Sequence, residues 1–80
     1  MYLEIVTPEK MLYTGEIHLV KLPGSQGSFE VMKDHAAIIS TLESGEIKVI
    51  SNDGEENFFE ITGGVIEVAK NNVIILATTE

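Results

Sequence analysis

Few side chains in this sequence could carry out chemistry. There is no cysteine, and the two histidines, His18 and His35, lie far apart, on a predicted strand and in a predicted loop. Asp34 precedes His35, and an Asp–His pair can orient an imidazole, but we favour a hydrogen bond that holds the loop or a contact with a partner. The histidine spacing does not suit metal binding, and carboxylates are too abundant to be diagnostic. We therefore predict no catalytic residue, no metal site and no cofactor.

A turn rich in glycine is the other candidate ligand site. It runs from Leu22 to Phe29 and contains a proline, two glycines and two serines. Phosphate-binding loops carry Lys-Ser/Thr and lead into a helix whose N-terminal amides hold the phosphate. The segment Gly24-Ser25-Gln26-Gly27 has no such lysine, and no helix is predicted after it. Because exposed turns on rigid scaffolds often contact partners, we predict an interaction site here and no nucleotide site.

The composition excludes several classes of protein. With 80 residues the chain forms one domain, 1–80, and its net charge is −8, with five scattered lysines and no arginine. Binding to a phosphate backbone needs clustered positive charge, so direct nucleic-acid binding is not expected. No apolar run reaches the roughly 20 residues that span a bilayer, and no secretory signal pattern is present, so we expect no insertion into a bilayer.

The elements that position these residues are nearly all strands. Alternation of apolar and polar residues predicts strands at residues 2–6, 11–13, 17–22, 29–32, 37–42, 46–51, 58–61, 65–69 and 73–77. A helix is the competing interpretation of residues 34–42, but β-branched residues and missing caps disfavour it. Short strands with regular turn signals predict an all-β fold, a flattened antiparallel β-sandwich of about eight to ten short strands.

One predicted strand changes its inward face along its length. Ile17 and Leu19 share one parity, whereas Val20 and Leu22 share the other. Because successive side chains of a strand point to opposite faces, this switch predicts a bend or a β-bulge.

Several predicted turns separate the strands. Gly15 is expected to interrupt one strand, Asn52-Asp53-Gly54 predicts a hairpin turn, and Asn71-Asn72 predicts a further turn. Gly63-Gly64 predicts a sharp reversal, so valine at Gly63, where we expect a positive φ, should disrupt folding.

Apolar residues suggest the core and a docking patch. Phe29, Phe58 and Phe59 are expected in the core, which argues against a nucleic-acid or carbohydrate platform of exposed aromatic rings. Met11 and Leu12 suit either the core or a docking patch. The last predicted strand, residues 73–77, is apolar throughout, so both its faces are covered or one meets a partner.

Lys33 offers an alternative function. An acidic all-β unit with Met32-Lys33-Asp34 resembles a lipoyl or biotinyl carrier domain, in which a lysine at a hairpin tip is modified. The flanking residues differ from the surroundings expected of a carrier lysine. Intact mass after expression with the modifying ligase would separate this alternative from the interpretation below.

The order and spacing of many short motifs resemble the N-terminal β-sandwich domain of the epsilon subunit of F-type ATP synthase, the family that includes the mitochondrial delta subunit. The matching residues cover almost the whole chain and are Leu3-Glu4-Ile5-Val6-Thr7-Pro8, Leu12-Tyr13-Thr14-Gly15-Glu16, Leu22-Pro23-Gly24, Gly27, Phe29, His35-Ala36, Leu42, Gly45, Gly63-Gly64, Ile66-Glu67-Val68, Asn72-Val73 and Leu76-Ala77.

The sequence departs from the family pattern at two positions. Glu30 stands where members usually have glycine, and Ala37 stands where they usually have proline. Members typically continue into a C-terminal helical hairpin that can inhibit ATP hydrolysis and in some bacteria binds ATP. This sequence stops at Glu80, before such a hairpin. If it is complete, the resemblance implies a short form, and if it is a fragment, the hairpin lies outside it; in either case no nucleotide is expected without that hairpin.

The resemblance implies a non-catalytic subunit of the central stalk that links the gamma subunit to the c-subunit ring. The expected location is peripheral, at the cytoplasmic face of the bacterial inner membrane. The residues expected to contact the c-ring are Ser25, Gln26, Gly27, Ser28, Phe29, Asp34, His35, Ala36 and Ala37. Those expected to contact gamma are Met11, Leu12, Val73 and Ile75. Glu or Arg at Gly27 is expected to weaken rotor assembly while the domain stays folded.

Overall fold

The computed structural model describes residues 1–80 and contains strands but no helix. The eight strands are β1 (Tyr2–Val6), β2 (Met11–Gly24), β3 (Gly27–Met32), β4 (Ile38–Leu42), β5 (Gly45–Ser51), β6 (Glu56–Ile61), β7 (Gly63–Ala69) and β8 (Asn72–Thr78). The all-β fold class is confirmed, and the competing helix at residues 34–42 is wrong. The chain thus has no helix of the length and apolarity that crossing a membrane requires.

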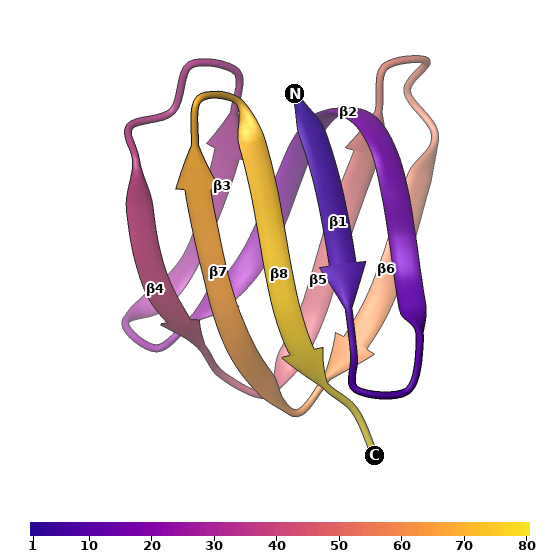
Figure 1. Cartoon of the computed structure of the whole chain (residues 1–80), viewed down its shortest axis with the longest axis vertical. Helices are drawn as coiled ribbons and strands as arrows, with labels where there is room; N and C mark the ends of the chain where they lie inside the picture. Colours follow the sequence, from indigo (N-terminus) through magenta and orange to yellow (C-terminus); the bar gives the residue numbers. More distant parts are fainter.

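Two layers of strands face each other across the core (Figure 1). The front layer contains β4, β7, β8 and β1, and the back layer contains β3, β5 and β6, while β2 begins in front and ends behind. All pairings are antiparallel except that of β1 with β8, which is parallel and was not predicted. The molecule measures 29 × 23 × 19 Å, so the sandwich is flattened as expected.

The predicted change of inward face in β2 is confirmed. The register with β5 shifts between Ile17 and Leu19, which leaves His18 as the extra residue of a bulge. Ile17 is buried before the bulge, and Val20 and Leu22 are buried after it. The bulge therefore lets both the front-layer part and the back-layer part of β2 turn apolar side chains toward the core. By contrast, the predicted interruption at Gly15 is wrong, because β2 continues through it.

Strand alternation builds the core. Fifteen apolar side chains form one buried cluster, contributed by every strand. Phe29 and Phe59 pack against this cluster, and the Phe59 and Tyr13 rings form an edge-to-face pair with a centroid distance of 6.0 Å. Phe58 was expected in the core, but it is 52% exposed because it has the opposite parity to the buried Ile61. The prediction for Phe58 is therefore wrong.

Two turns adopt tight conformations that involve residues other than glycine. In the β5–β6 turn, Gly54 has φ 88°, and Asp53 accepts hydrogen bonds from the Ser51 hydroxyl and the Glu55 N–H. In the β7–β8 turn, Lys70 and Asn71 have φ 52° and 63°, as the central residues of a type I′ turn do. The predicted turn at Asn71-Asn72 is confirmed, but Asn72 already belongs to β8, where it is the first residue and pairs with Ala69.

The positive φ predicted for Gly63, which was the reason to expect that valine there disrupts folding, is wrong. Gly63 has no positive φ, and a Cβ atom there would meet Leu42 O and Thr78 Oγ1 at an ordinary 3.6 Å. Gly64 is the restricted position, since a Cβ atom there would lie 2.5 Å from Leu76 O and 3.1 Å from Ala77 Cα. These are backbone atoms of a paired strand and cannot move aside cheaply.

We expect Gly64→Ala to destabilise the domain and Gly63→Ala to be close to neutral. Forcing a methyl group against the β8 backbone should cost about 1–3 kcal/mol. In a domain of this size that lowers the melting temperature by roughly 5–20 °C. Thermal unfolding followed by circular dichroism tests this, and equal melting temperatures for the two variants would contradict it.

The Ser51 and Glu55 hydrogen bonds lower the pKa of the exposed Asp53 carboxyl. A carboxyl whose folded pKa is depressed stabilises the fold above its ordinary pKa, and that contribution is lost as the pH falls through the folded value. We expect Ser51→Ala to raise the pKa of Asp53 toward its ordinary value. An NMR titration of the Asp53 carboxyl measures this, and an unchanged pKa would show that Ser51 is not the main cause.

Candidate interaction surfaces

The β2–β3 hairpin depends on the close approach of its two strands. Gly24 pairs with Gly27, and Ser25 and Gln26 form the connection. A Cβ atom on Gly24 would lie 2.7 Å from both Gly27 O and the Phe29 ring, so only glycine fits. Gly27 has φ 118°, a backbone conformation that strains any other residue, although open space surrounds it. A substitution at Gly27 therefore strains the turn as well as changing its surface, and the expected loss of rotor assembly without unfolding stays a prediction.

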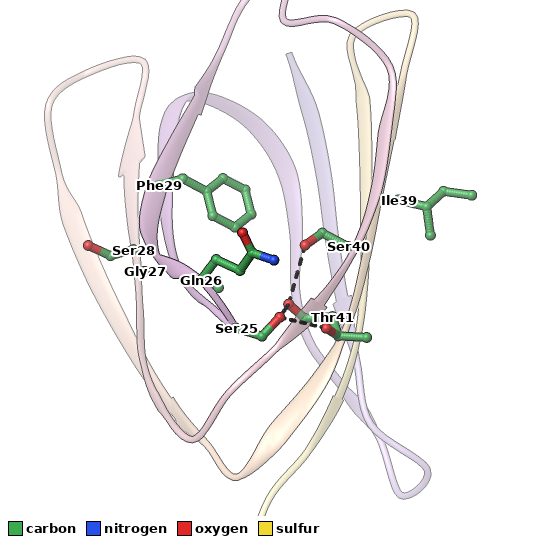
Figure 2. Close-up of a pocket in the computed structure, with 9 residues that line it drawn as sticks. Ser25, Gln26, Gly27, Ser28, Phe29, Ile39, Ser40 and Thr41 are labelled. Carbon is green, nitrogen blue, oxygen red and sulfur yellow. Dashed lines mark hydrogen bonds between the residues drawn. The ribbon is translucent and has the colours of Figure 1, made fainter.

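The hairpin is tied to strand β4. The Ser25 and Thr41 hydroxyls are 2.7 Å apart, and the Ser25 N–H and hydroxyl both donate to Thr41 O at 3.4 Å. Between hairpin and strand lies an open hollow of about 570 Å³ (Figure 2). Residues 24–29 line it on one side, and Ile39, Ser40 and Thr41 complete it.

Sequence reasoning missed the β4 side of this hollow. Ile39 is 75% exposed, more than any other large apolar side chain, and its side chain points to the outer side of β4 (Figure 2). Ile38 packs against the core instead. The two adjacent isoleucines were the available signal, because only one of them can face inward on a strand.

The loop that contains Asp34 is held by the β7–β8 turn. The Asp34 N–H donates to Asn71 Oδ1 at 2.7 Å, and Asn71 Nδ2 donates to Asp34 Oδ1 at 3.2 Å. Asp34 has φ 66°, so this clamp fixes an unusual backbone conformation. The His35 ring Nδ1 donates to Ala36 O at 2.8 Å. Asp34 therefore fastens the loop to another turn, and its carboxylate bonds to Asn71.

The structure does not bring the two segments of the expected c-ring contact together. Ser25 and Gln26 precede β3 and Asp34 follows it, so the segments lie at opposite ends of the sandwich (Figure 1). Six residues of strand separate them by roughly 17–20 Å. A partner could touch both only along the whole β3–β4 side.

Val73 and Ile75 are corrected as candidates for the gamma contact. Both side chains are fully buried in the core of the domain, because β8 alternates and they have the inward parity. The alternate residues Ile74 and Leu76 have the outward parity, and Leu76 is 58% exposed. Of the other two candidates, Leu12 packs against the core and Met11 is 49% exposed.

An apolar row crosses the outer face of the front layer. The register places Val65 opposite Leu76, Leu76 opposite Val6, and Val6 opposite Met11. Directly paired residues project from the same face of a sheet, so these side chains are neighbours. Val6, Leu76 and Pro8 also line a hollow of about 340 Å³. We call Val65, Leu76, Val6 and Met11 the apolar row.

A polar row runs beside it on the same face. Glu67 is opposite Ile74, Ile74 is opposite Glu4, and Glu4 is opposite Thr14. The Tyr2 hydroxyl donates to Glu4 Oε2 at 2.5 Å and lies 2.8 Å from Thr14 Oγ1. The hydrogen bond to Glu4 raises the pKa of Tyr2, because losing the phenol proton would place a second negative charge beside the carboxylate.

The remaining candidates lie apart from these surfaces. His18 is exposed at the β2 bulge, and the chain has no group of three His, Cys, Asp or Glu residues placed to hold a metal ion. Lys33 is exposed at the start of the loop that joins β3 to β4. That loop carries the chain from the back layer to the front layer (Figure 1), whereas the carrier alternative requires a lysine at a hairpin tip.

The fold defines a class of protein, namely a small β-sandwich with a glycine-bearing hairpin at one end and an apolar row on the outer face of one layer. The model of the ATP synthase delta/epsilon chain beta-sandwich domain matches residues 1–79, and the chain belongs to this family. The family resemblance is therefore confirmed, and the carrier domain is not supported.

Named relatives agree with the family. The chain is 43% identical over 74 residues to the ATP synthase epsilon chain of Chlorobaculum tepidum. The matched region covers 92% of this chain and 84% of the relative. It is 42% identical, with the same coverage, to that of Chlorobium limicola. The epsilon chain of Protochlamydia amoebophila is 39% identical, and there the match covers 94% of this chain but 51% of the relative.

Solved structures share the fold. A chain of the Euglena gracilis mitochondrial ATP synthase, in a structure of OSCP, F1 and the c-ring, superposes with a TM-score of 0.89 at 18% identity over 94% of this chain. A chain in a structure of the Tetrahymena thermophila mitochondrial ATP synthase central stalk and c-ring superposes with a TM-score of 0.83 at 21% identity over 98% of this chain. This chain covers 48% and 63% of the lengths of those two chains.

We expect Asn71→Gly to loosen the Asp34 loop without unfolding the domain. Glycine accepts the positive φ at this position but removes both hydrogen bonds to Asp34. Amide exchange at Asp34 should become roughly five- to tenfold faster, since a hydrogen bond contributes about 1 kcal/mol. Lys70→Gly is the matched control in the same turn, and equal exchange rates in both variants would contradict the clamp.

Proposed function

We propose that this chain is a non-catalytic subunit of the ATP synthase central stalk. It holds the gamma subunit against the ring of membrane c subunits, so that rotation of the ring is passed on as torque. The observation that carries the proposal is the family match over residues 1–79. Relatives named ATP synthase epsilon chain, at 43% and 42% identity, support it. A peripheral location on the cytoplasmic face of a bacterial membrane follows from the same proposal.

The architecture suits a part that transmits force. Its core is one cluster of fifteen buried apolar residues, and close-packed interiors have low compressibility. The long strand β2 pairs with β1, β3, β4 and β5, so load applied to either layer reaches the other through one continuous strand.

We assign the c-ring contact to the β2–β3 hairpin and the neighbouring part of β4. Ser25, Gln26 and Ser28 are exposed, uncharged and rich in hydrogen-bonding groups, which suits a polar loop of the ring. Ile39 adds an exposed apolar side chain next to the hollow, on the outer side of β4 (Figure 2). Because residues 34–37 lie at the opposite end of β3, we leave them out of this contact.

We assign the gamma contact to the apolar row of Val65, Leu76, Val6 and Met11. An apolar centre with a polar surround is the usual composition of a stable interface. Register and burial place the row on the outer face of the front layer, so gamma and the ring would occupy different parts of the sandwich surface.

We expect Ser28→Arg to weaken binding of the c-ring at least tenfold while gamma binding and the melting temperature stay unchanged. Ser28 is exposed on β3 and has an ordinary φ, so a bulky cation there blocks the contact without straining the turn. The measurement is recovery of purified c-ring on immobilised gamma with this subunit.

Two variants serve as controls for this experiment. Asn52→Arg adds the same charge at an exposed turn far from the hairpin, and Ala36→Arg tests the Asp34 loop. Full c-ring recovery with Ser28→Arg, or equal losses with all three variants, would contradict the assignment.

A further inference from the structure

The outer face that carries the apolar row has an uneven distribution of charge. Its outward strand residues include three carboxylates, those of the half-buried Glu4 and of the exposed Glu16 and Glu67, and strands β1, β4, β7 and β8 contain no lysine. Lys10 and Lys70 lie in the turns at the two ends of this layer. The face is therefore an apolar strip bordered on one side by negative charge.

The register fixes the positions of two of these carboxylates. Glu67 on β7 and Glu4 on β1 both pair with Ile74, on opposite sides of β8. Glu67 and Glu4 are therefore two strand spacings apart, roughly 10 Å. Each lies two residues along its strand from the apolar row, a distance of roughly 7 Å. Glu16 lies further along and forms an ion pair with the Met1 amino group at 3.2 Å.

Glu4 is also held in place. The Tyr2 hydroxyl donates to its Oε2 and lies beside Thr14 Oγ1, so the carboxylate keeps one orientation on the face. Holding a charge before binding reduces the ordering cost at the moment of association.

We propose that Glu4 and Glu67 select the partner that covers the apolar row, and that this partner presents an apolar ridge about 14 Å long with two cationic side chains roughly 10 Å apart along one border. Under the proposed function, on which this inference rests, the partner is the gamma subunit. A second copy of this chain does not match this partner, because the same strands of a copy carry no lysine and both chains have a net charge of −8.

The experiment measures the affinity of purified gamma subunit from the same organism for this chain at two salt concentrations. The test variant is Glu4→Gln with Glu67→Gln, in which glutamine keeps an oxygen that accepts the Tyr2 hydrogen bond. The matched control is Glu46→Gln with Glu60→Gln. This pair removes the same charge from directly opposed, exposed positions on β5 and β6, in the other layer.

At roughly 50 mM salt the test variant should bind gamma about five- to twentyfold more weakly than the unmodified chain, and the control should stay within about twofold. At roughly 500 mM salt the difference should shrink, because exposed charges are then screened over a few ångströms. Circular dichroism melts of both variants verify that each one is folded.

The other outcomes separate the two proposals. If Leu76→Ser abolishes gamma binding while the test variant binds normally, the apolar row is the contact but the carboxylates do not select the partner, which overturns this inference alone. Equal weakening in test and control variants also overturns it. If the unmodified chain does not bind gamma, the proposed function fails and this inference fails with it. A homodimer that Leu76→Ser dissolves would show that a second copy covers the row.

Discussion

The bulge at His18 in β2 is the constraint on which the rest of the structure depends. By adding one residue to the strand, it turns the inward face from Ile17 to Val20 and Leu22, so that β2 can pair with β1 in one layer and with β3 and β5 in the other. A strand without the bulge would expose one of these two apolar sets, because alternation has a period of two. The single core and the position of the β2–β3 hairpin both follow from this residue.

Alternation also explains why the two proposed contacts differ in chemistry. Every outward position on β7, β8 and β1 is free of the core, so apolar residues there, such as Leu76 and Val6, form a surface without weakening the interior. The hairpin is built differently, since Gly24 lies so close to Gly27 O and the Phe29 ring that no side chain fits there, and the connecting residues Ser25 and Gln26 are polar. The hairpin end of the sandwich is therefore polar, whereas the front face carries an apolar row beside carboxylates.

The turns show how the fold holds loops in strained conformations. Asp34, Lys70 and Asn71 all have positive φ without being glycine. Asp34 and Asn71 compensate through paired hydrogen bonds between two loops that are distant in sequence. Asn and Asp tolerate this conformation better than other residues do, which is consistent with both being present at this junction.

The sequence alone predicted the strands, the β2 bulge, the hairpin turn at Asn52-Asp53-Gly54 and the family, because these depend on local alternation, turn chemistry and motif order. It did not determine which strands pair. Only the tertiary structure decided which parity of the wholly apolar strand β8 faces the core, so that Val73 and Ile75 are buried, and that Leu76 aligns with Val6 across a parallel pair. It also decided that Gly64, and not Gly63, has no room for a side chain, since the obstructing carbonyl belongs to Leu76 on the neighbouring strand. These properties arise from contacts between residues far apart in the chain, which local patterns cannot specify.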